Sequence, residues 1–308
     1  MSGEAGTGEE ESAVQDREEQ MMGMRFVRVL GCALLAALVA MTWVSGAAAV
    51  ATIAACDTLS TFGQTYNVTA DLHASGGDCL VVANNRVTIN LQGHSIIQDT
   101  ASAFGAGITD GGIARDLTVV KNGSIKGFVF GIELDSSTRN EVRNVTVLEN
   151  DLDGILVGDN SLVKASVAHD NGLTGILGGD GIRGKERVQV QDSEASGNGA
   201  NGIRVGSSCL VTGNTAEENL EDGIATGGSC TVSRNTASDN DGDGIDVGQE
   251  DGTVNGSKSL VTANLAKDNF DDGIRVECPS TVTNNVSSGN FLNYDFVGGN
   301  CTTSNNKE

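Results

Sequence analysis

The sequence predicts an all-β solenoid, a coil in which each turn contributes short strands that pair in parallel with those of the next turn. A Gly-Ile pair recurs at intervals of 21 to 29 residues, and an asparagine stands four residues before six of these glycines. No segment of helix length shows an apolar period of 3.6 residues, which excludes a helical solenoid. The pairs begin at Gly107, Gly131, Gly154, Gly175, Gly202, Gly223, Gly244 and Gly273, and the asparagines are Asn150, Asn171, Asn198, Asn219, Asn240 and Asn269.

Residues 1–51 precede this repeat and contain the features of a secretory signal peptide. Arg25 and Arg28 stand before a charge-free apolar run at 29–44, and small residues follow that run. A basic start, an apolar centre and small residues before the cleavage point define such a signal. We expect cleavage after Ala49 or Ala51.

The acidic segment 1–20 fits neither a signal peptide nor a membrane span. We interpret it as a misassigned start, with the true start at one of the methionines Met21, Met22 and Met24. The alternative for the leader is an uncleaved membrane anchor, because apolar residues continue to Ala55. A membrane contact is therefore expected only through an uncleaved leader.

Charge and cysteine content indicate the compartment and exclude one class of partner. The formal net charge is −22, with no excess of Lys and Arg to neutralise phosphates, so nucleic acid is excluded as a partner. Six of the seven cysteines follow the leader. An even number of cysteines behind a signal peptide indicates disulfides in an oxidising compartment. We expect a secreted, periplasmic or cell-surface protein.

The first strand of each predicted turn follows the repeat glycine. In residues 203–205 and 274–276, Ile-Arg-Val places two apolar side chains on the inner face and the arginine on the outer face. Segments such as Leu-Val-Thr at 210–212 supply a second strand. Successive turns would stack about 4.8 Å apart and align equivalent residues into ladders. Stacked asparagines would then bond the backbone of the turns.

The cysteines agree with this register, because each pair is separated by one turn. The separations within the pairs are 23, 21 and 23 residues, and neighbouring turns lie within disulfide reach. The predicted bridges are Cys56–Cys79, Cys209–Cys230 and Cys278–Cys301.

The asparagine–glycine turns and the segment Val-Thr-Ile-Asn-Leu-Gln-Gly-His at 87–94 resemble the right-handed parallel β-helix superfamily. This is the pectate-lyase-like fold, and the closer resemblance is to its secreted or periplasmic repeat proteins of the NosD type. The resemblance covers residues 56–301 and implies a right-handed parallel β-helix of about eleven turns. It implies an N-terminal cap at 52–93, a β-helix at 94–301 and a flexible tail at 302–308.

Aspartates that precede the repeat glycines form a predicted carboxylate column, with members Asp153, Asp222, Asp243 and Asp272. Carboxylates about 5 Å apart repel each other by on the order of 3 kcal/mol per pair. The last three would therefore bind a cation such as Ca²⁺, as the lyases that this sequence resembles do, or cap turns or extend into water. Asp-Gly is also ordinary turn chemistry, and this interpretation is the favoured one.

Two arginines and two of these aspartates are the candidate catalytic residues. The resemblance implies that Arg204 or Arg275 acts as base or charge partner in uronate chemistry, together with Asp222 and Asp243. The alternative is structural, because Asp246 and Arg275 would form a cross-strand ion pair on adjacent turns. The hydrolase segment of the fold is only partly present at 241–246, and the Asp-Pro-His segment of its epimerases is absent.

Two longer turns, near 178–187 and 248–258, would leave the coil on the same side and border a groove roughly 14 Å wide. One wall would be Arg183, Lys185 and Arg187 and the other Glu250 and Asp251, with Arg204, Asp222 and Asp243 nearby. The predicted substrate-binding residues are Arg183, Lys185, Asp246, Glu250 and Asp251. Because Asp-Gly-Ile-Arg at 180–183 also matches the repeat, the register of the first loop stays open.

The favoured function is non-catalytic binding of an extracellular polysaccharide or cell-surface glycan. No cofactor is required in this interpretation, and calcium is the one ion expected to assist. The alternatives are a polysaccharide lyase or glycoside hydrolase, and a structural or adhesive protein without a small ligand. Few aromatic side chains follow the leader, so binding would depend on polar contacts.

Overall fold

The structure is a computed structural model, which describes residues 50–100, 105–173, 178–248 and 258–308. All of these residues lie in one compact unit, and they form strands and turns without a helix. No helix in this part of the chain is therefore available to cross a membrane. The signal peptide and start-site predictions concern residues 1–49, outside the described residues.

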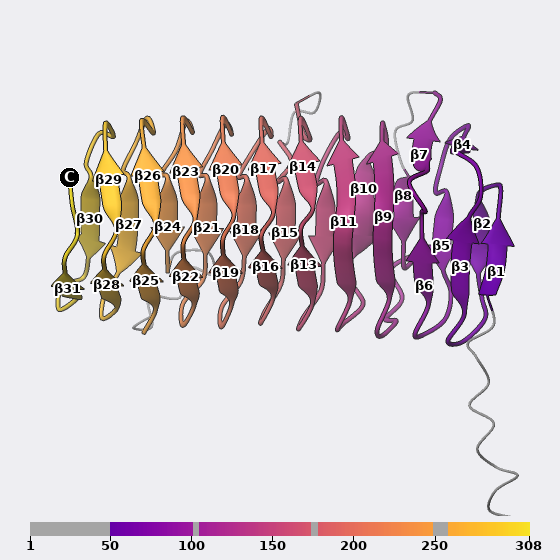
Figure 1. Cartoon of the computed structure of the whole chain (residues 1–308), viewed down its shortest axis with the longest axis horizontal. Helices are drawn as coiled ribbons and strands as arrows, with labels where there is room; N and C mark the ends of the chain where they lie inside the picture. Colours follow the sequence, from indigo (N-terminus) through magenta and orange to yellow (C-terminus); the bar gives the residue numbers. More distant parts are fainter. Residues whose placement is uncertain (1–49, 101–104, 174–177, 249–257) are drawn as a thin grey trace, which may run out of the picture. The chain divides into compact units, whose positions relative to one another are not determined.

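One strand from each coil joins an 11-stranded parallel sheet (Figure 1). Its members are β2 (Asp57–Leu59), β5 (Leu80–Val82), β8 (Ala106–Thr109), β10 (Phe130–Leu134), β12 (Ile155–Val157), β15 (Ile182–Gly184), β18 (Ile203–Val205), β21 (Ile224–Thr226), β24 (Ile245–Val247), β27 (Ile274–Glu277) and β30 (Tyr294–Val297). Eleven coils agree with the predicted number.

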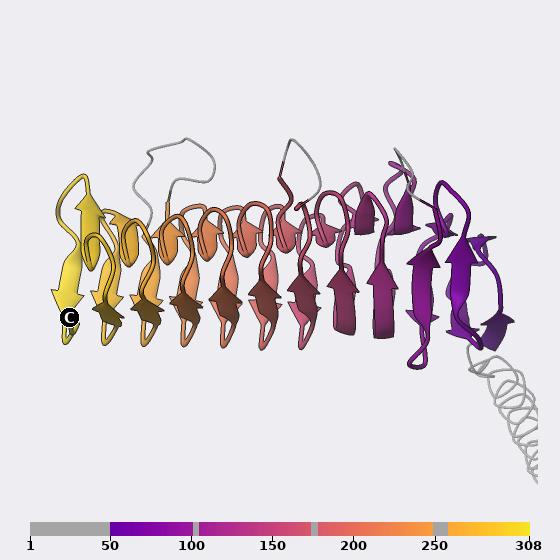
Figure 2. The same ribbon diagram turned by 90° about the horizontal axis from the view of Figure 1, so that it is seen from above.

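The remaining strands form a 20-stranded parallel sheet. They are β1 (Val50–Ile53), β3 (Thr65–Val68), β4 (Leu72–Ala74), β6 (Thr88–Asn90), β7 (Ser95–Gln98), β9 (Val119–Lys126), β11 (Glu141–Leu148), β13 (Leu162–Lys164), β14 (Val167–His169), β16 (Gln189–Gln191), β17 (Glu194–Ser196), β19 (Leu210–Thr212), β20 (Thr215–Glu217), β22 (Thr231–Ser233), β23 (Thr236–Ser238), β25 (Leu260–Thr262), β26 (Leu265–Lys267), β28 (Thr281–Thr283), β29 (Val286–Ser288) and β31 (Thr302–Ser304). In most coils, two of these strands follow each strand of the 11-stranded sheet, and Figure 2 shows the coils side by side.

The core follows from strand alternation. Ile155, Ile182, Ile203 and Ile224 pair in succession across the 11-stranded sheet, and all four side chains are buried. Buried valines and alanines of the 20-stranded sheet close the interior on its other sides. The apolar column therefore runs along the whole coil, as a period-2 pattern repeated once per turn requires.

Two asparagine ladders confirm the predicted role of the turn asparagines. In the first ladder, the backbone N–H and the Nδ2 of Asn198 both donate to the Oδ1 of Asn219, and its Nδ2 also contacts the carbonyl of Ala168. The second ladder repeats this pattern from Asn214 to Asn306. These amides satisfy turn backbone groups that would otherwise be buried without partners.

The three predicted disulfides are present, and each joins adjacent coils. The Cα atoms are 4.5 Å apart in Cys56–Cys79 and Cys209–Cys230, and 4.9 Å apart in Cys278–Cys301. These distances correspond to neighbouring strands of the stack, so the cysteine spacing gave the correct register.

Strand pairing reaches both ends of the described coil. Residues 52–93, expected as a cap, already form parallel-paired strands, and the first strand starts at Val50. The tail 302–308, expected to be flexible, belongs to the last coil, because β31 pairs with β28 and Asn306 completes the second asparagine ladder. The hydrogen bonds of the ladder account for this order.

The position of the first long turn also needs correction. Ile182 pairs with Ile155 and Ile203, so the repeat pair of this coil is Gly181-Ile182, and the predicted pair at 175–176 lies outside the described residues. The extra residues therefore precede β15, whereas those at 249–257 follow β24. The predicted common side of the two longer turns rests partly on residues 249–257, which lie outside the described residues, so it stays a prediction.

Candidate functional site

The outer face of the 11-stranded sheet carries a row of side chains from the middle residue of each strand. Arg183, Arg204, Ala225, Asp246 and Arg275 are cross-strand neighbours in this order. Each follows an inward-facing isoleucine, so strand alternation directs it outward. The row places two arginines together, then a small side chain, then an ion pair.

A column of aspartates lies beside this row, and each of them comes directly before the repeat glycine of its coil. The Oδ1 of Asp153 accepts the N–H of Asp180 at 2.8 Å, and the Oδ1 of Asp180 accepts the N–H of Asn201 at 3.0 Å. The Oδ1 of Asp222 accepts the N–H of Asp243 at 2.7 Å. The aspartates thus bond the backbone of the next coil, which supports the interpretation of the column as turn chemistry.

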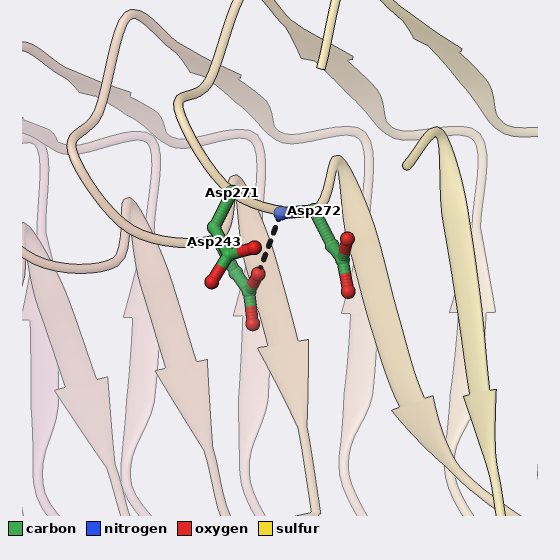
Figure 3. Close-up of side chains that lie close together, drawn as sticks. All are labelled: Asp243, Asp271 and Asp272. Atoms are coloured by element: carbon green, nitrogen blue, oxygen red, sulfur yellow. Dashed lines mark hydrogen bonds between the residues drawn. The ribbon is translucent and has the colours of Figure 1, made fainter. Parts of the chain in front are cut away.

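The carboxylate column ends in the pair Asp243 and Asp272, where the same bond recurs. The Oδ1 of Asp243 accepts the N–H of Asp272 at 2.8 Å, which is the dashed line in Figure 3. Asp272 is buried, and its Oδ1 has no hydrogen-bond partner in the part of the chain that the structure describes.

Burial raises the pKa of carboxyls along this face. It brings the pKa of Asp153 to about 6 and that of Asp243 to about 7. The backbone N–H that each accepts opposes the shift, and the neighbouring aspartates reinforce it. Burial also raises the pKa values of Asp180, Asp222 and Asp272. Near neutral pH, part of this column therefore carries protons.

The two neighbouring arginines lie over the buried part of the column. Arg183 places Nη1 3.6 Å from the Oδ2 of Asp153 and Nε 3.9 Å from that of Asp180, and Arg204 places Nη1 3.9 Å from the same Asp180 oxygen. These separations exceed the roughly 2.7–2.9 Å of a charge-assisted hydrogen bond. The side chains stay 47% and 34% exposed, so the guanidiniums face solvent while the carboxylates balance their charge.

Asp246 and Arg275 form the predicted cross-strand pair. Arg275 Nη1 lies 3.2 Å from the Oδ2 of Asp246, and its Nε lies 3.4 Å from the Oδ2 of Asp295 on the next strand. Burial raises the pKa of Asp246 to about 7, although the guanidinium of Arg275 lowers it. The other oxygen, Oδ1, is buried without a hydrogen-bond partner among the described residues.

The comparisons with known proteins give the family. A model of the right-handed β-helix region matches residues 65–209 and 178–307, which together cover most of the chain. The chain belongs to the right-handed β-helix family. No curated protein sequence matches it.

Solved right-handed β-helix structures show the same fold at low identity. The mannuronan C-5 epimerase AlgE6 A-module of Azotobacter vinelandii is 12% identical with a TM-score of 0.64, covering 86% of this chain and 92% of the module. The periplasmic alginate epimerase AlgG is 11% identical with a TM-score of 0.54, covering 84% and 70%. The Dettilon tailspike protein is 14% identical with a TM-score of 0.52, covering 80% and 61%. At these identities the likeness shows the fold.

The candidate metal ligands of this β-helix are placed differently from the prediction. Asp243, Asp271 and Asp272 each bring one carboxylate oxygen within 4.8 Å of the others (Figure 3). Asp222 is not in this group, although it neighbours Asp243 along the column. The three oxygens suit a hard cation such as Ca²⁺, which takes about 6–8 oxygen ligands and would need further ones from water.

The predicted substrate-binding residues are only partly brought together. Arg183 belongs to strand β15, not to a loop wall, because the repeat register includes it. Lys185 bonds Asp135 with Nζ–Oδ2 at 3.0 Å, at the turn following the strand. Glu250 and Asp251 lie outside the described residues. The assembled part of the site is the row Arg183–Arg204–Ala225–Asp246–Arg275.

Sequence reasoning missed Asp180 and Asp295 as partners of the arginines. The signal for Asp180 was present, since Asp-Gly-Ile-Arg at 180–183 matches the repeat. Asp295 had no such signal, because its strand begins with Tyr294 where the preceding coil has Ile274. Its place follows only from the three-dimensional register.

Proposed function

We propose that this chain is an exported right-handed β-helix protein that binds polysaccharide on the outer face of its 11-stranded sheet, without catalysis. The observation that supports this most is the row of cross-strand neighbours from Arg183 to Arg275, in which four of five adjacent strands carry a charged side chain. Such a row can present charged groups to an extended chain from every coil of the row except that of Ala225. Between Arg204 and Asp246, Ala225 contributes only a methyl group, so no long side chain projects from the middle of the row.

The aspartate column supports a binding role over a catalytic one. Asp222 and Asp243 each use Oδ1 to hold the backbone of the next coil, and four of the coils repeat this arrangement. Catalytic groups in contrast converge on one point. The three disulfides indicate an oxidising extracellular or periplasmic compartment, which agrees with export.

Solved structures with this fold include a mannuronan C-5 epimerase, an alginate epimerase, an α-1,3-glucanase and a tailspike. The names of the epimerases and of the glucanase concern polysaccharides, which supports a glycan as partner here. The Asp-Pro-His segment expected of the epimerases is absent from this chain.

Affinity electrophoresis on gels containing neutral or acidic polysaccharides, with calcium and with chelator, tests the proposal. We expect retardation by at least one polymer and a loss of affinity of about tenfold or more in the double variant Arg183→Ala/Arg204→Ala. Arg234→Ala is the matched control, since it removes an exposed arginine from the 20-stranded sheet side. Equal loss in the control, or no polymer retained, would contradict the proposal.

One observation favours a second candidate, a polysaccharide lyase or hydrolase. Burial raises the pKa of Asp243 and of Asp246 to about 7, the charge of Asp246 adds to the shift at Asp243, and Asp246 pairs with the guanidinium of Arg275. Carboxyls that titrate near neutral pH are suited to acid–base catalysis. Release of new reducing ends or unsaturated products, lost in Asp243→Asn, would establish this function in place of simple binding.

A further inference from the structure

A second surface, away from the arginine row, combines an aromatic ring with two arginines. It lies on the turns that follow the first four strands of the 11-stranded sheet. At equivalent places these turns have a residue in the left-handed backbone region: Gly63 (φ 67°), Arg86 (φ 59°), Leu117 (φ 62°) and Arg139 (φ 59°). Backbone bonds join these positions from coil to coil, for example Arg86 N–H to the carbonyl of Asp116 and Leu117 N–H to that of Thr138. Their side chains therefore stack in one column.

Arginines in this column normally pair with a carboxylate of the preceding coil. Arg139 pairs with Asp116, which comes directly before Leu117. Arg187 places Nη2 3.0 Å from the Oδ2 of Asp159, which comes directly before the left-handed Asn160. In both cases the acidic partner belongs to the preceding coil and comes directly before the left-handed residue of that coil.

Arg86 departs from this rule, because the equivalent place in the preceding coil is occupied by Phe62. The guanidinium carbon of Arg86 lies 5.7 Å from the centroid of the Phe62 ring, a cation–π contact. Among the described residues, Arg86 makes no ion pair. The ring holds the guanidinium in place and leaves its positive charge without a carboxylate to balance it.

These residues border a pocket of about 330 Å³, lined by Phe62, Asn85, Arg86, Asp116, Leu117 and Arg139. This volume lies within the roughly 300–1,000 Å³ of small-molecule sites. Two guanidiniums and one carboxylate give the lining a net charge of one positive unit, on a chain whose formal net charge is −22. Phe62 is 59% exposed, and Leu117 is exposed beside it.

We propose that this pocket binds a carboxylated sugar ring, a hexuronate unit, with its carboxylate on Arg86. A guanidinium matches a carboxylate with two parallel N–H donors, and the single excess positive charge matches a monoanion. The exposed ring of Phe62 and the side chain of Leu117 offer apolar surface to the C–H groups of the sugar. The amide of Asn85 and the carboxylate of Asp116 offer hydrogen bonds to its hydroxyls. A small inorganic anion would contact the arginine but not the apolar surface of Phe62 and Leu117.

Titration calorimetry with glucuronate tests the assignment, with glucose and acetate as matched ligands that lack the carboxylate or the ring. We expect saturable binding of glucuronate, and weaker binding of glucose and acetate. Phe62→Asp restores the carboxylate that the other arginines of the column have, so it should reduce glucuronate affinity about tenfold or more. Arg86→Gln should do the same, while Arg187→Gln, in the same column with its acidic partner, should bind like the wild type.

Several outcomes would overturn the proposal. Glucose or acetate bound as tightly as glucuronate would refute recognition of a carboxylated ring. Unchanged binding in both Phe62→Asp and Arg86→Gln would show that glucuronate binds elsewhere. The double variant Arg183→Ala/Arg204→Ala separates this pocket from the proposed polysaccharide face, since it should leave glucuronate binding intact even where polymer binding is lost. Both Phe62 and Arg86 are exposed, so these variants are expected to fold.

Discussion

The buried carboxyl of Asp246 gives a quantitative prediction about stability. Its pKa is about 7 in the folded protein and 3.8 as a model value. One pKa unit corresponds to about 1.4 kcal/mol, so ionised Asp246 lowers the free energy of unfolding by about 4 kcal/mol relative to its protonated form. Asp246→Asn replaces the carboxyl by an uncharged group of the same shape. We therefore expect the variant to be more stable than the wild type at pH 8 by up to about this amount.

The expected gain depends on pH in a defined direction. A carboxyl whose pKa is higher in the folded than in the unfolded state binds more protons when folded. Its contribution to stability is complete below about pH 4 and is lost as the pH rises through about 7. The variant and the wild type should therefore have similar free energies of unfolding near pH 4 and diverge toward pH 8.

Urea denaturation at several pH values measures this difference. Asp295→Asn is the control, because it removes the other carboxyl on Arg275 from a side chain that is 36% exposed, compared with 10% for Asp246. The control should not gain stability at pH 8. A variant Asp246→Asn that is less stable than the wild type by the same amount at every pH would refute the reasoning, since Asp246 would then act as an ordinary ion-pair partner.

Three further predictions concern the ladder, a disulfide and calcium. Asn219→Ala removes four buried hydrogen bonds and should lower the free energy of unfolding, measured by urea denaturation, by about 3 kcal/mol or more. The control Asn306→Ala, on the partly exposed last coil, should lower it by about 1 kcal/mol. Equal losses in the two variants would contradict this prediction. Replacing Cys209 and Cys230 by serine should cost about 3 kcal/mol, measured under non-reducing conditions, and an unchanged midpoint would show that the bridge is dispensable. Calcium should raise the melting temperature of the wild type and not that of Asp271→Asn, and an equal rise in both would exclude the Asp243–Asp271–Asp272 cluster.

Much of the fold could be predicted from the sequence because each turn repeats the same buried groups. The asparagines and the cysteine separations specify which residues stack, since a shift by one residue would turn every side chain to the opposite face. The same rule explains the errors. Two Gly-Ile pairs, at 175 and 181, compete in one coil, and only packing decides between them. The tail was predicted to be flexible although Asn306 follows Asn285 by the period of 21 residues.

The candidate site was less predictable, because it depends on contacts between coils of unequal length. The pairing of Asp246 with Arg275 followed from the repeat, whereas the partnership of Arg183 with Asp153 needed the corrected register. The contact of Arg86 with Phe62 joins the irregular early coils, where no regular spacing aligns the turns. Side chains that stack within regular coils can be predicted from spacing, and those on irregular turns cannot.

The strict 21-residue period in the middle of the chain also bears on how such a protein can change in length. The repeat glycines Gly181, Gly202, Gly223 and Gly244 are equally spaced, and the bonds between their coils are alike. Duplicating or deleting one 21-residue block here would add or remove a whole coil without altering the register of its neighbours. The chain therefore contains a module that recombination can copy, so that the length of the outer face can evolve in steps of one coil, separately from the chemistry of the residues on it.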